Sequence, residues 1–347
     1  MSRFLQLHFL TFYPPSNLNR DDTGRPKTAV IGGSTRLRIS SQALKRAWRT
    51  SELFAEKLEG HLASRTQRLG DDVMAHLIEG GMDKPKAIEA ARKIAGVFGK
   101  IKEQSDKNEA HPARIEQLAF VSPEERAAAL ALADRALAGE DISPKAADLL
   151  GHTDQAADLA MFGRMLAADP DYNREAAVQV AHAFTTHKVS VEDDFYTAVD
   201  DLKSSTEDAG AGFIGETGFG AGVFYLYACI DRALLTRNLG GQAGLAADAV
   251  ASLLEAAATI APGGKQNSFA SRARAHYVLA ERGSAQPRTL AAAFTKSVEK
   301  DPVQGSVKAL RDWRDALDVA YGDQTERAEM LVGESGSLAE LLAFVRS

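Results

Sequence analysis

The chain has 347 residues, of which 45% are hydrophobic and 25% are charged, and its 41 basic and 47 acidic residues give a formal net charge of −6. A chain of this length can bury a substantial core in one large domain or in two to three small ones. The acidic balance argues against non-specific attraction of nucleic acid over the whole surface, and the single cysteine, Cys229, excludes an intramolecular disulfide and a cysteine-based zinc site.

The apolar run at the N-terminus, MSRFLQLHFLTFYPP, is too short for the hydrophobic region of a signal peptide, and no segment approaches 18 consecutive apolar residues. The sequence therefore predicts a soluble cytoplasmic protein with no membrane partner.

The first predicted element is a strand at residues 3–12, whose aromatic and aliphatic content favours burial on most of both faces. Pro14 and Pro15 should end it. Residues 16–35 are polar, basic and glycine-containing, which predicts a loop, and a short strand at 36–39 should follow.

A helix is predicted from about residue 41, with Ser40 or Ser41 as its N-cap. Apolar and small residues recur in it at helical spacing and should form its buried stripe: Leu44, Ala47, Trp48, Ser51, Ala55 and Leu58.

Residues 60 to about 185 are rich in Ala, Leu, Glu, Asp and Arg with Pro and Gly punctuation, which predicts several short helices. The clearest begins at Pro123 and ends at Gly139. Residues 191–222 are acidic and glycine-rich, so they predict either a long protruding hairpin or a mobile loop. The buried strand GVFYLYACI follows directly.

The remaining predicted elements are a helix at 243–260, a strand near 275–281, and helices at 287–299, 304–318 and 337–346. This order indicates an α+β fold in which a helical subdomain is inserted into a small sheet domain. A ferredoxin-like core is compatible with it if one strand is hidden in a segment that looks irregular.

Positive charge is concentrated between residues 20 and 49, where eight basic residues face only Asp21 and Asp22. In the helix, Gln42, Lys45, Arg46 and Arg49 share the face opposite the apolar stripe. Arg36 and Arg38 should project together from the preceding strand. A solvated helix face is the simpler interpretation, but such faces usually mix signs, and residues 23–51 contain no acidic residue. The pattern favours a track for successive phosphates.

The stretch PSNLNRDDTGRPKTAVIGGSTRLRISSQALKRAWR resembles the N-terminal signature of the CasC-type backbone subunit of the type I-E CRISPR Cascade complex. Further matching stretches follow in the same order along nearly the whole chain: FGRM at 162–165, AHAFTTHKV at 181–189, YTAVDDL at 196–202, GVFYLYACI at 222–230, NLGG at 238–241 and GGKQNSFA at 263–270.

The resemblance implies a non-catalytic subunit that polymerises along the CRISPR RNA and presents it to target DNA in antiviral defence. Its expected partners are CRISPR RNA, target DNA paired to the guide, neighbouring copies of itself and other Cascade subunits, with no cofactor and no metal. The implied fold is an RRM-like (ferredoxin-like) palm with inserted helical fingers and a β-hairpin thumb. The boundaries are 1–59 and 223–347 for the palm, 60–185 for the fingers and 190–222 for the thumb.

Residue by residue, the resemblance implies RNA contacts in the palm by Arg20, Lys27, Ser40, Gln42, Lys45 and Arg49, and Arg46 joins them on the basic helix face. It also implies a wedge beside the RNA–DNA duplex formed by Met165 and by Tyr196 and Thr197 of the thumb. Members of the family often carry basic residues after Gly-Gly, whereas Ser34 and Thr35 follow here, so part of the phosphate grip could move to Arg36.

Two alternatives stay open. His182 and His187 flank AFTT, and a histidine can serve as acid or base in a metal-independent ribonuclease, although a core or capping role is more common.

Asp21 and Asp22 lie in a loop where related RNA-targeting subunits carry a cleaving aspartate, but ordering of the loop by pairing with Arg20 or Arg25 is the favoured interpretation. A homo-oligomeric scaffold without RNA is the second alternative. GAGFIG at 210–215 lacks the strand and helix of a dinucleotide site.

Overall fold

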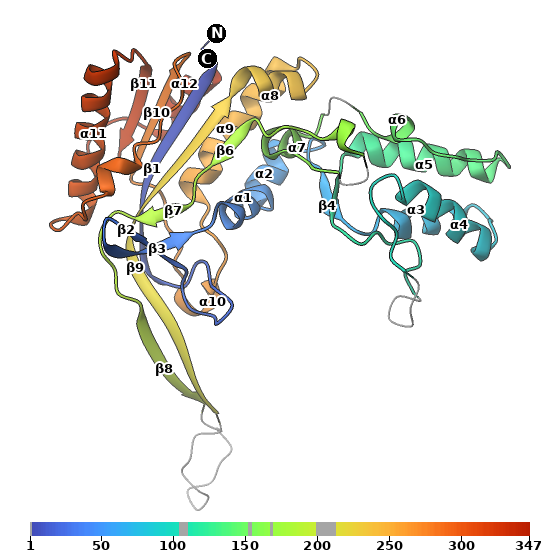
Figure 1. Ribbon diagram of the computed structural model, residues 1–347, viewed down its shortest axis with the longest axis horizontal. Helices are drawn as coiled ribbons and strands as arrows, with labels where there is room; N and C mark the ends of the chain where they lie inside the picture. The colour runs from blue at the N-terminus through green and yellow to red at the C-terminus, as the bar shows by residue number, and fades with distance from the viewer. Residues whose placement is uncertain (1, 104–109, 152–154, 167–168, 199–212) are drawn as a thin grey trace, which may run out of the picture. The chain divides into compact units, whose positions relative to one another are not determined.

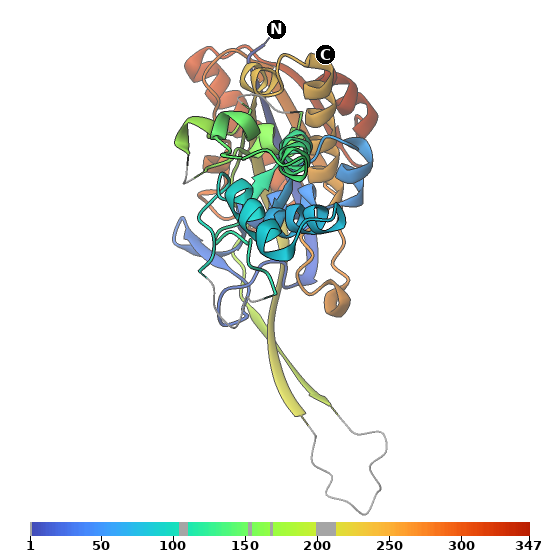
Figure 2. The same cartoon turned by 90° about the vertical axis from the view of Figure 1, so that its right-hand side faces the viewer.

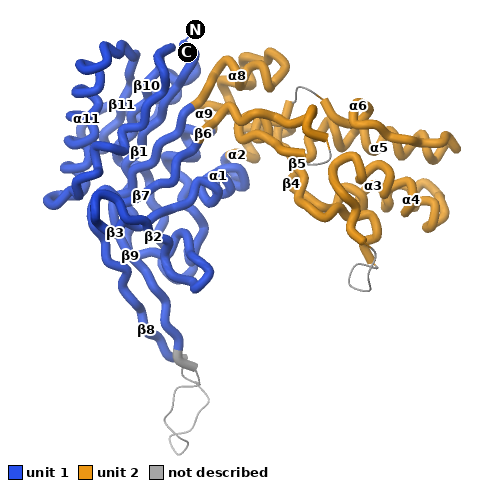
Figure 3. The backbone as a smooth tube through the Cα atoms, viewed as in Figure 1, with its two compact units in different colours: residues 1–53, 180–229, 253–347 blue, residues 54–179, 230–252 orange. Residues whose placement is uncertain are grey.

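The computed structural model describes residues 2–103, 110–151, 155–166, 169–198 and 213–347. The chain forms two compact units (Figure 3). Unit 1 comprises residues 1–53, 180–229 and 253–347, and unit 2 comprises residues 54–179 and 230–252.

Unit 1 is built on an antiparallel sheet, which confirms the predicted α+β class (Figure 1). The strands follow in the order β11 (Glu326–Leu331), β10 (Tyr277–Gly283), β1 (Phe4–Ser16), β9 (Phe213–Asp231), β7 (Ala183–Thr185), β3 (Ser34–Ile39) and β2 (Thr28–Ile31). Two further strands, β6 (Val178–Val180) and β8 (Glu192–Ala198), also pair with β9. The helices and turns that complete this unit are α1 (Ser41–Arg49), α10 (Gln266–Phe269), η3 (Ala291–Phe294), α11 (Pro302–Tyr321) and α12 (Leu338–Arg346), and α9 (Ala243–Thr259) begins in unit 2 and ends here.

The first strand is buried on both faces, as predicted, but it does not end at the prolines. Strand β1 runs through Pro14 and Pro15 to Ser16, whose hydroxyl donates to the carbonyl of Gly220 in β9 at 3.3 Å. Proline fixes φ near a value that extended backbone accepts, and it removes only an N–H donor. The two prolines therefore weaken the hydrogen-bond ladder without ending the strand.

Strands β2 and β3 form a hairpin where the sequence predicted mostly loop. Their register pairs Thr28 with Leu37 and Ile31 with Ser34. The two connecting residues, Gly32 and Gly33, have φ of 56° and 74°, as a two-residue hairpin turn of primed type requires. Gly-Gly between two short apolar runs was the available signal for this turn.

The helix predicted from residue 41 is interrupted after Arg49. Helix α1 ends there and α2 (Glu52–Lys57) begins three residues later. The hydroxyl of Thr50 donates to the carbonyl of Arg46 at 2.8 Å, and that of Ser51 donates to the carbonyl of Trp48 at 2.7 Å. Such side-chain bonds compete with the helical ladder, which accounts for the break.

The C-terminal part of unit 1 departs from prediction at two places. Residues 287–299 form no α-helix but contain the short 3₁₀ turn η3. Leu290 and Phe294 anchor this segment in the core, which also contains Tyr225 and Leu310. Strand β11 was not expected, because its charged sequence ERAEML gives little strand signal, yet it pairs along its length with β10.

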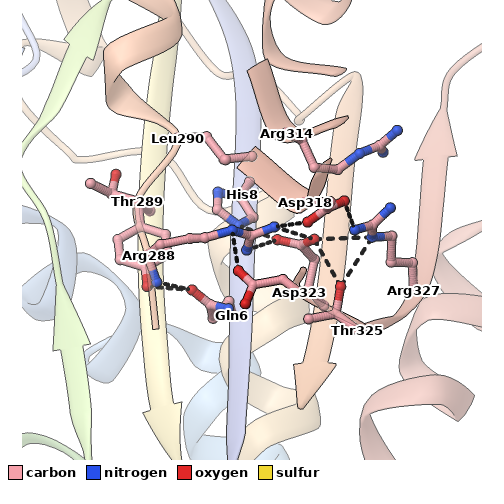
Figure 4. A network of polar contacts seen from close by, with 12 residues as sticks. Gln6, His8, Arg288, Thr289, Leu290, Arg314, Asp318, Asp323, Thr325 and Arg327 are labelled. Atoms are coloured by element: carbon pink, nitrogen blue, oxygen red, sulfur yellow. Dashed lines mark hydrogen bonds and ion pairs between the residues drawn. The ribbon is translucent and has the colours of Figure 1, made fainter. Parts of the chain in front are cut away.

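A buried polar network joins β1, β10, β11 and α11 (Figure 4). The fully buried carboxylate of Glu281 accepts hydrogen bonds from Arg288 at 2.9 Å and from Arg327 at 3.1 Å. Arg288 also donates to Asp318 at 2.7 Å, and His8 lies 3.3 Å from Glu281. Each of these groups therefore has a partner of opposite sign or a hydrogen bond within the network.

Strand β8 and the first part of β9 form an antiparallel ladder from Glu192 opposite Phe219 to Ala198 opposite Phe213. In two views this ladder runs out beyond the other strands of unit 1 (Figures 1 and 2). The hairpin alternative for residues 191–222 is thus observed in its stem, while residues 199–212 lie outside the described residues.

Unit 2 is mainly helical around its own core, which contains Val73, Ala91, Ile94 and Leu132. Its remaining elements are β4 (Ser64–Thr66), α3 (Leu69–Glu79), α4 (Lys84–Ala95), β5 (Ala119–Val121), α5 (Pro123–Leu137), α6 (Ala146–Leu149), α7 (Ala157–Phe162), η2 (Pro170–Tyr172) and α8 (Arg232–Asn238). The predicted helix at 123–139 is α5. It is capped by Ser122 and Glu125, which exchange hydrogen bonds with each other's backbone N–H.

Residues 230–252 belong to unit 2, whereas the sequence-based division placed them in the second part of the palm. The side chain of Asn238 donates to the carbonyls of Ala160 at 3.0 Å and Glu175 at 2.9 Å. The N–H of Asp231 bonds the carbonyl of Ala177 at 2.9 Å. These long-range backbone contacts attach the segment to its unit and carry no signal in the local sequence.

Candidate nucleic-acid interface

The loop that carries Arg20 and Lys27 is held in place by two asparagines. The amide of Asn17 donates to the carbonyl of Gly24 at 3.0 Å and to that of Gly218 in β9 at 2.9 Å. The side-chain oxygen of Asn19 accepts the backbone N–H of Ser40 at 2.8 Å. These bonds place the basic loop beside the start of helix α1, so the predicted loop and helix residues come together.

Asp21 orders the turn at the tip of this loop. Its Oδ1 accepts the N–H of Thr23 at 2.9 Å, the hydroxyl of Thr23 at 2.8 Å and the N–H of Arg25 at 3.0 Å. The hydrogen bond from the Thr23 hydroxyl, helped by those from backbone N–H groups, lowers the pKa of Asp21 below its usual value. The aspartate therefore orders the loop, as favoured from the sequence, but through hydrogen bonds, while the Arg25 guanidinium pairs with Asp193 of β8 at 2.8 Å.

Helix α1 presents its basic face as predicted. Ser40 is its N-cap, with its hydroxyl accepting the N–H of Ala43 at 3.3 Å. Leu44 and Trp48 are buried. On the other faces, Gln42 and Arg46 are exposed, and Lys45 and Arg49 are half-buried. Burial lowers the pKa of Lys45. The four side chains thus form a polar surface with three cations, of which Lys45 is partly desolvated.

The two arginines of strand β3 have different environments. Arg36 is fully buried and donates to the carbonyls of Thr185 and Phe294, both at 3.2 Å. The expectation that Arg36 takes over part of the phosphate grip is therefore wrong, because its guanidinium ties β3 to β7 and η3. Arg38, two residues later, is half-buried and its Nη1 lies 2.9 Å from Nδ1 of His182.

A hollow of about 400 Å³ lies where the basic loop meets the stem of the β8–β9 hairpin. Its lining includes Arg20, Arg25, Lys265 and the ring of Tyr196, with Glu216 as its carboxylate. Three cations and an aromatic ring around one hollow could hold a phosphate group and a stacked base.

Lys265 is the member of this hollow that the sequence analysis did not single out. It has φ of 53°, and Gly264 before it packs so closely on the loop that a Cβ would lie 2.4 Å from the carbonyl oxygen of Leu18. A non-glycine residue with positive φ is uncommon and costs conformational energy, so packing against the loop fixes this turn. The family-like motif GGKQNSFA at 263–270, which contains Lys265, is the signal in the sequence that points to this turn.

The three predicted wedge residues are exposed. Tyr196 and Thr197 are exposed in β8, and the side chain of Met165 in unit 2 is 85% exposed. Arg164, next to Met165, is buried and forms an ion pair with Glu125 at 2.6 Å. This pair anchors the side chain of the residue that precedes Met165. Exposure suits contact with a ligand, and the wedge role stays a prediction.

The histidines proposed for a ribonuclease occupy different settings. His187 donates from Nδ1 to the carbonyl of Lys188 at 3.1 Å, while its Nε2 accepts the N–H of Val223 at 3.1 Å. Burial and the nearby Arg36 lower its pKa, so the ring stays neutral with both nitrogens occupied. His182 is exposed, and its Nδ1 accepts a hydrogen bond from Arg38.

Within the described ranges, no three His, Cys, Asp or Glu side chains are placed to hold a metal ion together. None of the described helices has the length and apolar character needed to cross a membrane.

Comparison with known proteins gives one family and two informative structures. The sequence model of the family described as CT1975-like protein matches residues 5–343. A chain of a solved "CRISPR RNA-guided surveillance complex, pre-nicking" is 32% identical with a TM-score of 0.85, covering 99% of this chain and 98% of that one. A chain of a second "CRISPR RNA-guided surveillance complex" is 26% identical with a TM-score of 0.62, covering 99% and 96%. A search of curated protein sequences gives no significant match.

Proposed function

We propose, since this chain belongs to the CT1975-like protein family, that it is the RNA-binding backbone subunit of a type I-E CRISPR surveillance complex. The family match and the two structural matches confirm the resemblance to CasC-type backbone subunits that the motifs indicate. In the proposed role, copies of the chain line up along a CRISPR RNA in the cytoplasm. They hold its backbone and leave its bases free to pair with target DNA in antiviral defence.

The observation that carries the proposal is the gathering of cations from three separate segments of unit 1. Arg20 and Lys27 come from the loop, Lys45, Arg46 and Arg49 from α1, and Lys265 from the turn before α10. Cations without sequence-specific geometry suit a phosphate backbone, whose contacts position a nucleic acid and leave sequence readout to base pairing.

The division of labour follows from the same features. The sheet of unit 1 would act as the RRM-like palm, unit 2 as the fingers and the β8–β9 hairpin as the thumb. The chain would carry no catalytic activity, because Asp21 is used in ordering its loop and both nitrogens of His187 are hydrogen-bonded. Other subunits of the complex would supply cleavage.

The experiment that tests this function is purification of the full chain from cells that express its CRISPR RNA. Size exclusion with absorbance at 260 and 280 nm should give a large RNA-bearing oligomer, and the extracted RNA should be intact and of defined length. Complete digestion of that RNA should release smaller species. An RNA-free monomer that shortens added RNA would favour a ribonuclease, and an assembly that survives nuclease and high salt would favour an RNA-independent scaffold.

The site is tested by Lys45→Glu combined with Arg49→Glu. Reversal of two charges on one helix face should abolish RNA-bound oligomers without unfolding the chain, because phosphate contacts dominate backbone binding. The matched control is Lys300→Glu with Lys308→Glu, which makes the same charge change outside the basic segment and should retain RNA. Equal retention of RNA by both double variants would show that Lys45 and Arg49 are not needed for RNA binding.

A further inference from the structure

Three side chains that can carry positive charge meet where strands β2, β3 and β7 run side by side. Arg38 pairs with Phe184 across β3 and β7, and its N–H bonds the carbonyl of Lys27 at 2.8 Å. His182 lies two residues before Phe184, so the alternation of side chains along a strand places it diagonal to Arg38 on the same face. The sheet register therefore brings Lys27, Arg38 and His182 together from distant parts of the sequence.

The contact between Arg38 and His182 fixes the state of the imidazole. Nη1 of Arg38 lies 2.9 Å from Nδ1 of His182. A guanidinium can only donate, so Nδ1 must accept and carries no proton. The ring is neutral, with its proton on Nε2, and it takes one hydrogen bond from a cation.

The charged groups around His182 are all positive. Arg38 faces it from β3 and Lys27 from the residue before β2, and no carboxylate contributes from the described elements packed on it. Burial, followed by the charges of Arg38 and Lys27, lowers the pKa of His182. Within the described part of the chain, neither Lys27 nor Arg38 forms an ion pair with a carboxylate. The cluster therefore places two cations beside an exposed histidine, with no counter-ion among the described residues.

We infer that Lys27, Arg38 and His182 form a site for one phosphodiester oxyanion, and that filling this site protonates His182. The inference rests on the proposed RNA-binding function and adds to it a proton taken up with the RNA. It also adds two residues, Arg38 and His182, to the set that contacts the backbone.

The coupling has a simple chemical basis. Once a phosphate oxygen bearing a negative charge sits beside the cluster, the cationic form of His182 is favoured, and Nδ1 takes up a proton that the buffered solvent supplies. The protonated ring can no longer accept from Arg38, so the guanidinium is released and both groups donate to the oxyanion. One proton is consumed for each site filled, and no covalent bond to the RNA changes.

The test is binding of a short oligouridylate, whose bases do not titrate between pH 5.5 and 8, to the full chain at constant ionic strength. Affinity of the wild type should increase as the pH falls, by about tenfold for each unit by which the phosphate raises the pKa of His182. Calorimetry in two buffers of different ionisation enthalpy should show proton uptake within the pH range over which the affinity changes. His182→Gln keeps an acceptor and a donor but cannot titrate, so it should bind with no such pH dependence and no uptake.

The control is His76→Gln, which removes a half-buried histidine of unit 2 that is bonded to Asp134 and should leave the pH profile as in the wild type. A wild-type profile that persists in His182→Gln overturns the inference, and so does an affinity that falls with acid, since that result would mean that neutral His182 orients Arg38. In both cases RNA is still bound and the proposed function stands. Absence of RNA binding by the wild type at every pH overturns the function and the inference together.

Discussion

Unit 1 concentrates charge in two regions, the network around Glu281 and the basic loop with helix α1. They differ in how far their charges are neutralised within the protein. Around Glu281, whose carboxylate is fully buried, Arg288 and Arg327 both bond that carboxylate, and the charges neutralise one another (Figure 4). Around the basic loop and α1, the cations are exposed or half-buried, and Arg25 of the loop pairs with Asp193 of β8 at 2.8 Å.

The difference separates structural charge from functional charge. A buried ion pair offsets the cost of its own desolvation, so it stabilises a fold only while it is complete. Lys27 and Arg38 form no ion pair with a carboxylate in the part of the chain that the structure describes, which leaves both available for an external anion. Two arginines on one strand illustrate the difference. Arg36 is buried and bonds the carbonyl of Thr185, whereas Arg38, two residues later, is half-buried beside His182.

The strongest way to break this comparison is Glu281→Gln. Removal of the fully buried carboxylate takes a partner from the half-buried Arg288 and from Arg327, and loss of one partner of a buried pair costs about 3–5 kcal/mol. Urea unfolding should show this loss, while RNA affinity of the folded protein should not change. Asp312→Asn, which removes the exposed partner of Lys308, should cost less than about 1 kcal/mol and serves as the control. Equal costs for the two variants would refute the structural role of the network.

Acid should destabilise the network around Glu281 by protonating its carboxylate. Burial alone would raise the pKa of Glu281, but hydrogen bonds and charges of His8 and Arg288 outweigh it and hold the pKa below its usual value of 4.5. A carboxyl group with a lowered pKa stabilises the fold at higher pH and loses that contribution as the pH falls below about 4.5. Unfolding free energy of the wild type should therefore fall more steeply with acid than that of Glu281→Gln. If the unfolding free energies of the two proteins fell in parallel with pH, the pairing of Glu281 with His8 and Arg288 would be contradicted.

The comparison is sharpened by Arg36→Met and Arg38→Met. Arg36→Met leaves the carbonyls of Thr185 and Phe294 without their donor, which should cost about 1–3 kcal/mol of stability. Arg38→Met should leave stability within about 0.5 kcal/mol and weaken RNA binding. Thermal unfolding should show the loss of stability in Arg36→Met, and a binding assay should show the loss of RNA affinity in Arg38→Met. If Arg36→Met weakened RNA binding and Arg38→Met lowered stability, Arg36 would not be the structural arginine and Arg38 would not be the RNA-binding one.

The smallest expected effect concerns Asp193→Asn. Its ion pair with Arg25 is about half exposed, so stability should change by less than about 1 kcal/mol. Arg25 would become available to a phosphate, and the slope of log affinity against log salt should steepen by about one contact. Asp194→Asn, the next residue on β8, is the control. An unchanged slope in Asp193→Asn would mean that Arg25 does not reach the RNA.

Much of this architecture follows from local sequence. The apolar run of β1, the Ser40 cap of α1 and the Pro123 start of α5 are encoded within one or two turns of chain, and each is confirmed. The motif around Arg20 and Lys45 was sufficient to indicate the family. These features depend on hydrogen bonds and burial among near neighbours, so the sequence by itself determined them.

Other features depend on partners far away in the sequence. Arg36 is buried because Thr185 and Phe294 meet over it, and β11 exists because β10 supplies its ladder. Lys265 reaches the hollow through a positive φ that packing on Leu18 imposes. A local pattern cannot distinguish a buried arginine from an exposed one, because burial is set by contacts that form only when distant segments pack together.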